Sequence, residues 1–257
     1  MKIATYNVNG VNGRLPNLIR WLDEASPDIV CLQELKAPQN KFPTKAIEAV
    51  GYGAVWLGQK SWNGVAILAK GQQPHLTRRA LPGDSKDDQS RYIEAIVDGI
   101  LIGCLYVPER QPLSRTEIQL QTQMAQTVAR LRSRASRTER IIDSYRRLQC
   151  HADRTRRLQT GAVERRRTFS IEARNAFKTL VEQGWTDALR HLHPYEQIYT
   201  FWDYFRNAFG QNAGLRIDHF LLSPEAACDL IAADVDKHVR AWDHSSDHAP
   251  VWIELKE

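Results

Sequence analysis

Short apolar stretches that end in polar residues dominate the first third of the chain. Lys2 to Asn7 alternates between apolar and polar positions like a half-buried strand, and Asp28 to Glu34 has the continuous apolar run of a fully buried strand. Between them, apolar residues recur at helical spacing from Leu15 to Glu24, which predicts a helix. The order strand, helix, strand indicates an α/β fold.

The same patterns predict further elements along the chain. A hairpin is expected over 92–107, because Asp98-Gly99 separates two apolar strands and is a typical tight-turn pair. Ser170 is a suitable N-cap for a helix that runs to Val181. The remaining expected elements are a helix over 43–50 and strands over 53–56, 64–68, 216–222 and 249–253.

Composition limits the class of protein. The chain has 257 residues, of which 42% are hydrophobic, and no linker rich in Pro, Gly or Ser divides it, so we expect one domain over 1–257. No apolar run is long enough to span a membrane, and the N-terminus lacks a signal-peptide pattern. Cys31 and Cys104 lie in apolar strands without zinc-ligand spacing, which favours reduced core thiols and a cytoplasmic protein without membrane partners.

The net charge of +5 comes from one segment of unusual composition. Residues 109–168 hold 15 Arg, no Lys and 6 acidic residues, whereas the remainder has 20 basic and 24 acidic residues. A basic patch usually indicates nucleic-acid binding. Here the apolar periodicity also fails after Leu131, and the arginine excess is discounted as a binding surface because a shifted reading frame explains it.

Six polar residues stand at or near the ends of expected strands. The most compact group is Asp247-His248, a carboxylate next to an imidazole directly before the last strand. Taken singly, each has an ordinary structural explanation. Glu34 could be a solvated charge at a strand end, Tyr106 a core aromatic residue, and Asp247-His248 a chance pair in a surface loop. If the strands are central, however, the six converge on one rim of the sheets. They are Asn7, Glu34, Tyr106, Asp218, Asp247 and His248.

The oxygen donors in this set suit a magnesium ion, with manganese as the alternative metal. Asn7, Glu34 and Asp247 could hold the ion while water and substrate phosphate complete its shell. Such an ion would neutralise phosphate charge and stabilise the leaving oxygen. His248 could hydrogen-bond a phosphate oxygen, and Tyr106 could orient it. The residues therefore predict metal-dependent phosphoester chemistry.

Seven short motifs stand at these strand ends and in the loops between them. They are Tyr6-Asn7-Val8-Asn9-Gly10, Leu32-Gln33-Glu34, Ser61-Trp62-Asn63-Gly64-Val65-Ala66-Ile67, Leu105-Tyr106-Val107-Pro108, Thr200-Phe201-Trp202-Asp203-Tyr204, Leu215-Arg216-Ile217-Asp218-His219 and Ser246-Asp247-His248-Ala249-Pro250. In combination they closely resemble the exodeoxyribonuclease III family of DNA-repair enzymes, within the endonuclease/exonuclease/phosphatase superfamily. The resemblance covers residues 1–108 and 169–257.

The resemblance implies an α/β two-sheet sandwich flanked by helices, the DNase I-like fold. It also implies a magnesium-dependent phosphodiesterase that acts as a monomer on double-stranded DNA at abasic sites and 3′ ends. An abasic nucleotide costs little to extrude from the helix, and Trp202 would pack against it. The family roles fall on Tyr106, Asp218 and His248 as catalytic residues, Asn7, Glu34 and Asp247 as metal residues, and Asn9, Trp62, Asn63, Arg91 and Trp202 as DNA contacts.

One motif of the family, Gly-Asp-x-Asn, is missing from this chain. In the family it lies between the Tyr-x-Pro strand and the Phe-Trp-Asp loop, where its Asp activates water and its Asn stabilises the transition state. Here the candidate region, 141–147, reads Ile-Ile-Asp-Ser-Tyr-Arg-Arg. The resemblance therefore implies impaired activity for the chain as written.

A shifted reading frame accounts for this departure. Permitted codons for Arg146 to Ala152, read one base later, encode Gly-Asp-Tyr-Asn-Val-Met-Pro, and 153–162 and 110–120 likewise give family-like strings. Three matches in one frame, bounded where the resemblance stops and resumes, indicate slips near 108/109 and 168/169. The shift also explains the excess of arginine and the absence of lysine. A genuine lineage-specific insertion is the alternative.

Two other functions remain open from the sequence. One is a non-catalytic relic of the family, which would bind DNA weakly through its arginines or fold unstably. The other is a phosphoesterase of the superfamily that acts on a small phosphoester or a phospholipid. Trp202 and its aromatic neighbours argue against the second. The nucleotide sequence from codon 100 to codon 175 would best separate a miswritten nuclease from a true relic.

Overall fold

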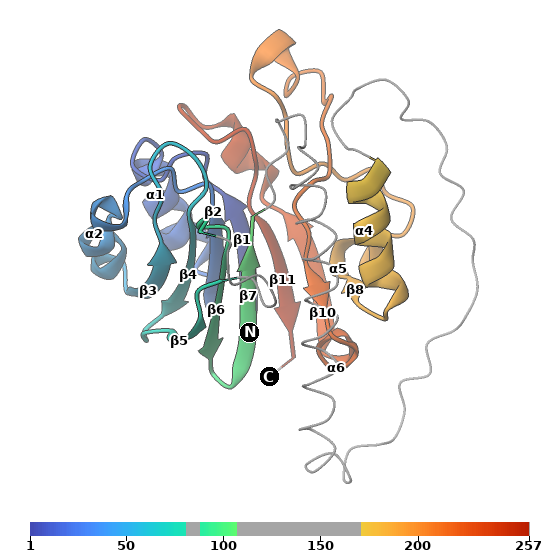
Figure 1. Cartoon of the computed structure of the whole chain (residues 1–257). Coiled ribbons are helices and arrows are strands. Elements are labelled where there is room, and N and C mark those ends of the chain that lie inside the picture. The colour runs from blue at the N-terminus through green and yellow to red at the C-terminus, as the bar shows by residue number, and fades with distance from the viewer. Residues whose placement is uncertain (81–87, 107–170, 257) are drawn as a thin grey trace, which may run out of the picture. The chain divides into compact units, whose positions relative to one another are not determined.

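The computed structural model describes residues 1–80, 88–106 and 171–256 (Figure 1). Residues 1–107 and 186–257 form one compact unit, which contains every candidate site residue, and residues 108–185 form a second unit. In the second unit, helix α4 (Ile171–Glu182) matches the helix expected over 170–181. The segment proposed to be frame-shifted lies outside the described residues, and the expectation of one domain over 1–257 stays a prediction.

A six-stranded sheet in the order β10-β11-β1-β2-β4-β3 is the largest element of the first unit. Strand β1 is parallel to β2, whereas β1 is antiparallel to β11, with Thr5 opposite Val251. The ends of β1 and β2 and the start of β11 therefore meet at one edge of the sheet. The strands are β1 (Lys2–Asn7), β2 (Ile29–Gln33), β3 (Tyr52–Leu57), β4 (Val65–Lys70), β10 (Leu230–Val235) and β11 (Val251–Leu255).

A three-stranded sheet packs against one face of the larger sheet. It consists of β5 (His75–Arg78), β6 (Tyr92–Val97) and β7 (Ile100–Leu105), and β6 and β7 form the expected hairpin. Buried side chains from both sheets, such as Ile67 and Ile93, share one apolar cluster. This two-sheet, mixed α/β arrangement confirms the expected fold class.

Helices cover the opposite face of the six-stranded sheet. Helix α1 (Leu15–Ala25) buries Leu18, Trp21 and Leu22 there, as its apolar periodicity predicts, and α2 (Thr44–Ala49) adds Ile47. Short helices elsewhere in this unit are α5 (Ala188–Leu192), α6 (Pro224–Cys228), η1 (Gln39–Lys41), η3 (Phe205–Asn207) and η4 (Lys237–Ala241). In the part of the chain that the structure describes, no helix combines the length and apolar character needed to cross a membrane.

The strand expected over 216–222 is wrong for most of its length. Only β9 (Leu221–Leu222) is a strand, and it pairs with β8 (Thr186–Asp187). Upstream, the backbone amides of Ile217 and Asp218 donate to the Thr200 hydroxyl at 3.0 and 3.1 Å. The Thr200 hydroxyl therefore accepts the backbone hydrogen bonds that a neighbouring strand would otherwise accept. Asp218 lies in a loop that these bonds hold in place.

Candidate active site

Glu34 lies at the sheet edge where β1 and β2 end. Two side chains donate to its Oε1: the Asn7 amide Nδ2 at 3.1 Å and the Tyr106 hydroxyl at 2.8 Å. Asn7 ends β1 and Tyr106 follows β7, so the carboxylate joins residues from both sheets. The structure thus brings together three residues that the sequence placed at separate strand ends.

A lysine that the sequence did not single out completes the surroundings of Glu34. Lys36 Nζ lies 2.7 Å from Glu34 Oε2 and donates to Asn9 Oδ1 at 2.5 Å. Burial by itself would raise the pKa of Glu34, but Lys36, Asn7 and Tyr106 together hold that pKa below its usual value. Glu34 and Lys36 both have positive φ, 52° and 49°, and this sharp bend has no sequence signal of its own.

Asp247 joins the same edge through the loop that precedes β11. Its Oδ1 accepts from Asn9 Nδ2 at 2.9 Å, while the Asn9 backbone amide donates to Asn7 Oδ1 at 3.0 Å. Ser246 Oγ donates to the carbonyl oxygen of Asn7 at 2.7 Å, which ties the loop to the end of β1. Asn9, expected to contact DNA, therefore bridges the two parts of the proposed metal site.

His248 and Asp218 form a buried pair next to Asp247. His248 Nδ1 lies 2.8 Å from Asp218 Oδ2 and 3.1 Å from Oδ1, and the Phe201 ring packs edge-on at 4.9 Å from the imidazole. Segment 200–202 makes the pair possible, because its backbone pairs with Leu215 and also with residues 247–249. The carboxylate at Nδ1 favours the tautomer with its proton there, so Nε2 is the ring atom suited to a substrate oxygen.

A second ionic cluster flanks Asp218 and was not anticipated from the sequence. Arg216 Nη1 contacts both oxygens of Asp187, at 2.8 and 3.1 Å, and lies 3.0 Å from His219 Nδ1. Burial, followed by the nearby Arg216 charge, lowers the pKa of His219 to about 4. Arg216 therefore connects the Asp187 carboxylate to His219, the residue that follows Asp218.

The other expected DNA contacts occupy different environments. Trp62 is 64% exposed, with Lys36 Nζ 5.7 Å from its ring centroid. The carbonyl oxygen of Arg91 accepts a hydrogen bond from the backbone amide of Tyr106. Asn63 is buried and donates to Gln59 and Gln89, while Trp202 is 1% exposed between Tyr199 and Phe209. Trp62 therefore offers an open aromatic face and Trp202 a buried one; contact with DNA stays a prediction for all of these residues.

The donor set fits a small divalent cation. Glu34 and Asp247 supply carboxylates and Asn7 an amide, and the Lys36 ammonium against Glu34 shows that the site accommodates positive charge. Among the described residues, no three or more His, Cys, Asp or Glu side chains form a closed ligand cluster. Magnesium is compatible with this arrangement, because it commonly uses one or two carboxylates and retains water.

Known proteins resemble the chain in sequence and structure. The sequence model of the endonuclease/exonuclease/phosphatase family matches residues 4–156. Exodeoxyribonuclease III from Haemophilus influenzae is 30% identical over 272 residues, covering 100% of both chains. The 3′ phosphatase NExo from Neisseria, solved with a product DNA hairpin, has 32% identity and a TM-score of 0.82; an AP endonuclease from Archaeoglobus fulgidus has 28% and 0.79. Both cover 100% of each chain.

Proposed function

The chain belongs to the exodeoxyribonuclease III branch of the endonuclease/exonuclease/phosphatase family, and we propose that it hydrolyses phosphodiesters of double-stranded DNA at abasic sites and 3′ ends, with magnesium. Relatives named as exodeoxyribonuclease III, 3′ phosphatase and AP endonuclease support this range of substrates. The family consists of hydrolytic enzymes acting on phosphoesters. The lesion, the metal and the monomeric state are part of the proposal.

The observation that carries the proposal is the joining of Glu34 to Asp247 through Asn7 and Asn9, with the Asp218–His248 pair adjacent. Carboxylate oxygens and an imidazole at one sheet edge are the groups needed to hold a phosphodiester and neutralise its developing charge. A structural ion pair would not require these groups to come from four separate segments. The arrangement supports phosphoester hydrolysis over simple binding.

Each residue has a distinct task in this proposal. Glu34, Asn7 and Asp247 would hold magnesium, which when bound neutralises phosphate charge and stabilises the leaving oxygen. Asp218 orients His248, which in its protonated form would donate from Nε2 to a non-bridging phosphate oxygen. Tyr106 holds Glu34 and would orient the phosphate from the other sheet. Attack by water on phosphorus then breaks the bond to the ester oxygen.

The base for the attacking water is the missing part. The family motif that supplies it is absent, and the candidate segment reads Ile-Ile-Asp-Ser-Tyr-Arg-Arg over 141–147, outside the described residues. We therefore propose that the chain as written is impaired and that a frame-corrected chain, with 109–168 encoded one base later, is the active form. The nucleotide sequence of codons 100–175 tests this directly, because a stop codon in the shifted frame would exclude it.

Single-turnover incision of a duplex with one abasic site tests the activity. The frame-corrected chain should incise with magnesium and remain inactive in EDTA, whereas a covalently closed duplex without an abasic site and a phospholipid ester should not be cleaved. A matched pair of variants, Glu34→Gln and Glu24→Gln, separates the site from the surface, because Glu24 is exposed on α1, where it pairs with Arg20. Equal incision by both variants would refute the proposed site.

A further inference from the structure

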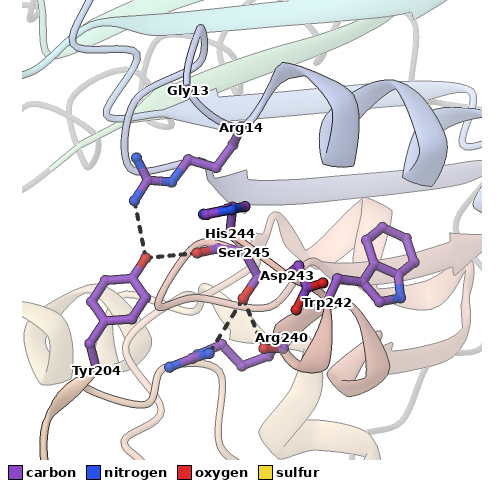
Figure 2. A pocket seen from close by; sticks show the side chains of 8 residues that line it. All are labelled: Gly13, Arg14, Tyr204, Arg240, Trp242, Asp243, His244 and Ser245. Carbon is purple, nitrogen blue, oxygen red and sulfur yellow. Dashed lines mark hydrogen bonds between the residues drawn. The ribbon is translucent and has the colours of Figure 1, made fainter.

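An open groove adjoins the proposed active site. It has a volume of about 460 Å³ and is lined by Gly13 and Arg14 before α1, by Tyr204 and Arg240, and by residues 242–245 (Figure 2). Figure 2 shows the Tyr204 hydroxyl between the Arg14 guanidinium and the backbone of Ser245. Neither arginine in this groove entered the set of residues predicted from the sequence.

Arg14 presents a charge without an ionic partner. Its Nη2 donates to the Tyr204 hydroxyl at 3.3 Å, and its Nε is buried without a hydrogen-bond partner. Over the residues the structure describes, no carboxylate pairs with it. A guanidinium bonded only to a neutral oxygen keeps its full charge and unused donors, so it can receive an anion.

Arg240 lies on the other side of Tyr204. Its guanidinium carbon is 5.0 Å from the centroid of the Tyr204 ring, and it donates to the carbonyl oxygen of Trp202 at 3.1 Å and to Ser245 Oγ at 3.3 Å. These acceptors are neutral, and no described carboxylate pairs with Arg240. Among the described residues that line the groove, Asp243 alone is acidic, so the two arginines leave this lining net positive.

Tyr204 connects the groove to the proposed metal site. Its hydroxyl donates to the Ser245 carbonyl oxygen at 2.8 Å and accepts from Asn9 Nδ2 at 3.4 Å. Asn9 Nδ2 also donates to Asp247 Oδ1 at 2.9 Å. A ligand held by Arg14 would thus lie only a short hydrogen-bonded path from the reacting phosphate.

We propose that this groove is a phosphate subsite. It binds a backbone phosphate of the DNA that is not the phosphate being hydrolysed. The inference rests on the proposed function. Guanidinium forks match the geometry and charge of phosphate, and contacts to unreactive phosphates set the register of a protein on its DNA. Free inorganic phosphate carries the same chemistry and is the alternative source.

The salt dependence of DNA binding tests the subsite independently of cleavage. Binding of a fluorescent abasic duplex is measured by anisotropy in EDTA across potassium chloride concentrations, for the wild-type chain, Arg14→Gln, Arg14→Lys and Lys70→Gln. The slope of log K against log salt is negative, and each lost phosphate contact reduces its magnitude by about 0.9. We expect Arg14→Gln to bind several-fold more weakly with a slope smaller in magnitude by about 1, and Arg14→Lys to retain the slope.

Lys70 is the matched control, because it ends β4 at the edge of the sheet opposite Glu34 and its exposed ammonium donates to Ser26 Oγ. Lys70→Gln should leave the slope unchanged. An unchanged slope in Arg14→Gln, or an equal decrease in Lys70→Gln, would overturn the subsite. Glu34→Gln in the frame-corrected chain should lose cleavage while keeping the slope, which separates failure of the catalytic site from failure of the groove.

Phosphorus NMR with inorganic phosphate distinguishes the two sources. Phosphate broadening that disappears in Arg14→Gln, with no change in the DNA slope, would assign the groove to free phosphate and overturn the DNA part of the proposal. A wild-type chain that binds neither duplex nor phosphate would overturn both the subsite and the proposed function. If Arg14→Gln both reduces the salt slope of DNA binding and abolishes the broadening of the phosphate signal, one site binds both ligands.

Discussion

His248 Nδ1 lies 2.8 Å from Asp218 Oδ2, although 30 positions separate the two residues in the chain. The loop that carries Asp218 is fixed to Thr200, and the next residues of the same segment, Phe201 and Trp202, pair with the backbone around His248. One short segment therefore sets the position of both partners. The pair can orient an imidazole without help from the strand that was expected there.

Asp218→Asn should slow incision by the frame-corrected chain about 10²–10⁴-fold, because a neutral amide does not stabilise the protonated imidazole that would donate to phosphate. Single-turnover rates at saturating duplex measure the effect, and DNA affinity should change little. Asp229→Asn is the control, since Asp229 is exposed at the C-cap of α6. A rate within twofold of the parent would show that His248 does not depend on Asp218.

Glu34→Gln should reduce magnesium-dependent incision by about 10²-fold or more and raise the magnesium concentration needed for half-maximal rate. The amide keeps the shape of the side chain but loses the charge that pairs with Lys36 and would hold the ion. A magnesium titration of single-turnover rates makes the measurement. An unchanged midpoint would place the metal elsewhere.

The convergence of site residues was predictable because it depends on strand direction. Asn7 ends β1, Glu34 follows the parallel strand β2, and Asp247 precedes the antiparallel strand β11, so the assumption that these strands are central neighbours is enough to place the three at one edge. The loop around Asp218 was not predictable, because its amides bond to a hydroxyl 17 and 18 positions away. An apolar run cannot distinguish such a loop from a strand.

Lys36 and Tyr204 illustrate a second limit. Both reach the site only through backbone bends and tertiary hydrogen bonds, such as that from Tyr204 to Ser245, 41 positions away. Short edge strands such as β5 and β10 were also absent from the expected elements, because partly exposed strands lack a continuous apolar run. Sequence patterns therefore located the catalytic edge but not the residues that brace it.

The lowered pKa of His219, about 4, predicts that stability decreases in mild acid. Between pH 6.5 and 4 the unfolded chain protonates this histidine while the folded chain keeps it neutral, so falling pH favours unfolding. The loss is at most about 3.5 kcal/mol, since one pKa unit corresponds to about 1.4 kcal/mol. Urea unfolding across this range should show the decrease in the parent and a smaller one in His219→Gln. His75→Gln, at an exposed strand position, should behave as the parent, and identical pH profiles for all three would contradict the prediction.

The chain as written should incise an abasic duplex far more slowly than the frame-corrected chain. Glu34, Asn7 and Asp247 would still hold magnesium in both, but only the corrected chain supplies an Asp for the water and an Asn for the transition state. General base catalysis contributes about 10²–10⁴-fold, and a transition-state donor about 10²–10³-fold. The two losses need not multiply, because such residues act as a unit. Single-turnover incision with magnesium, both chains side by side and each checked for cooperative unfolding, measures the difference. Equal rates from two folded chains would mean that the missing motif is dispensable and that the base lies among residues outside 109–168.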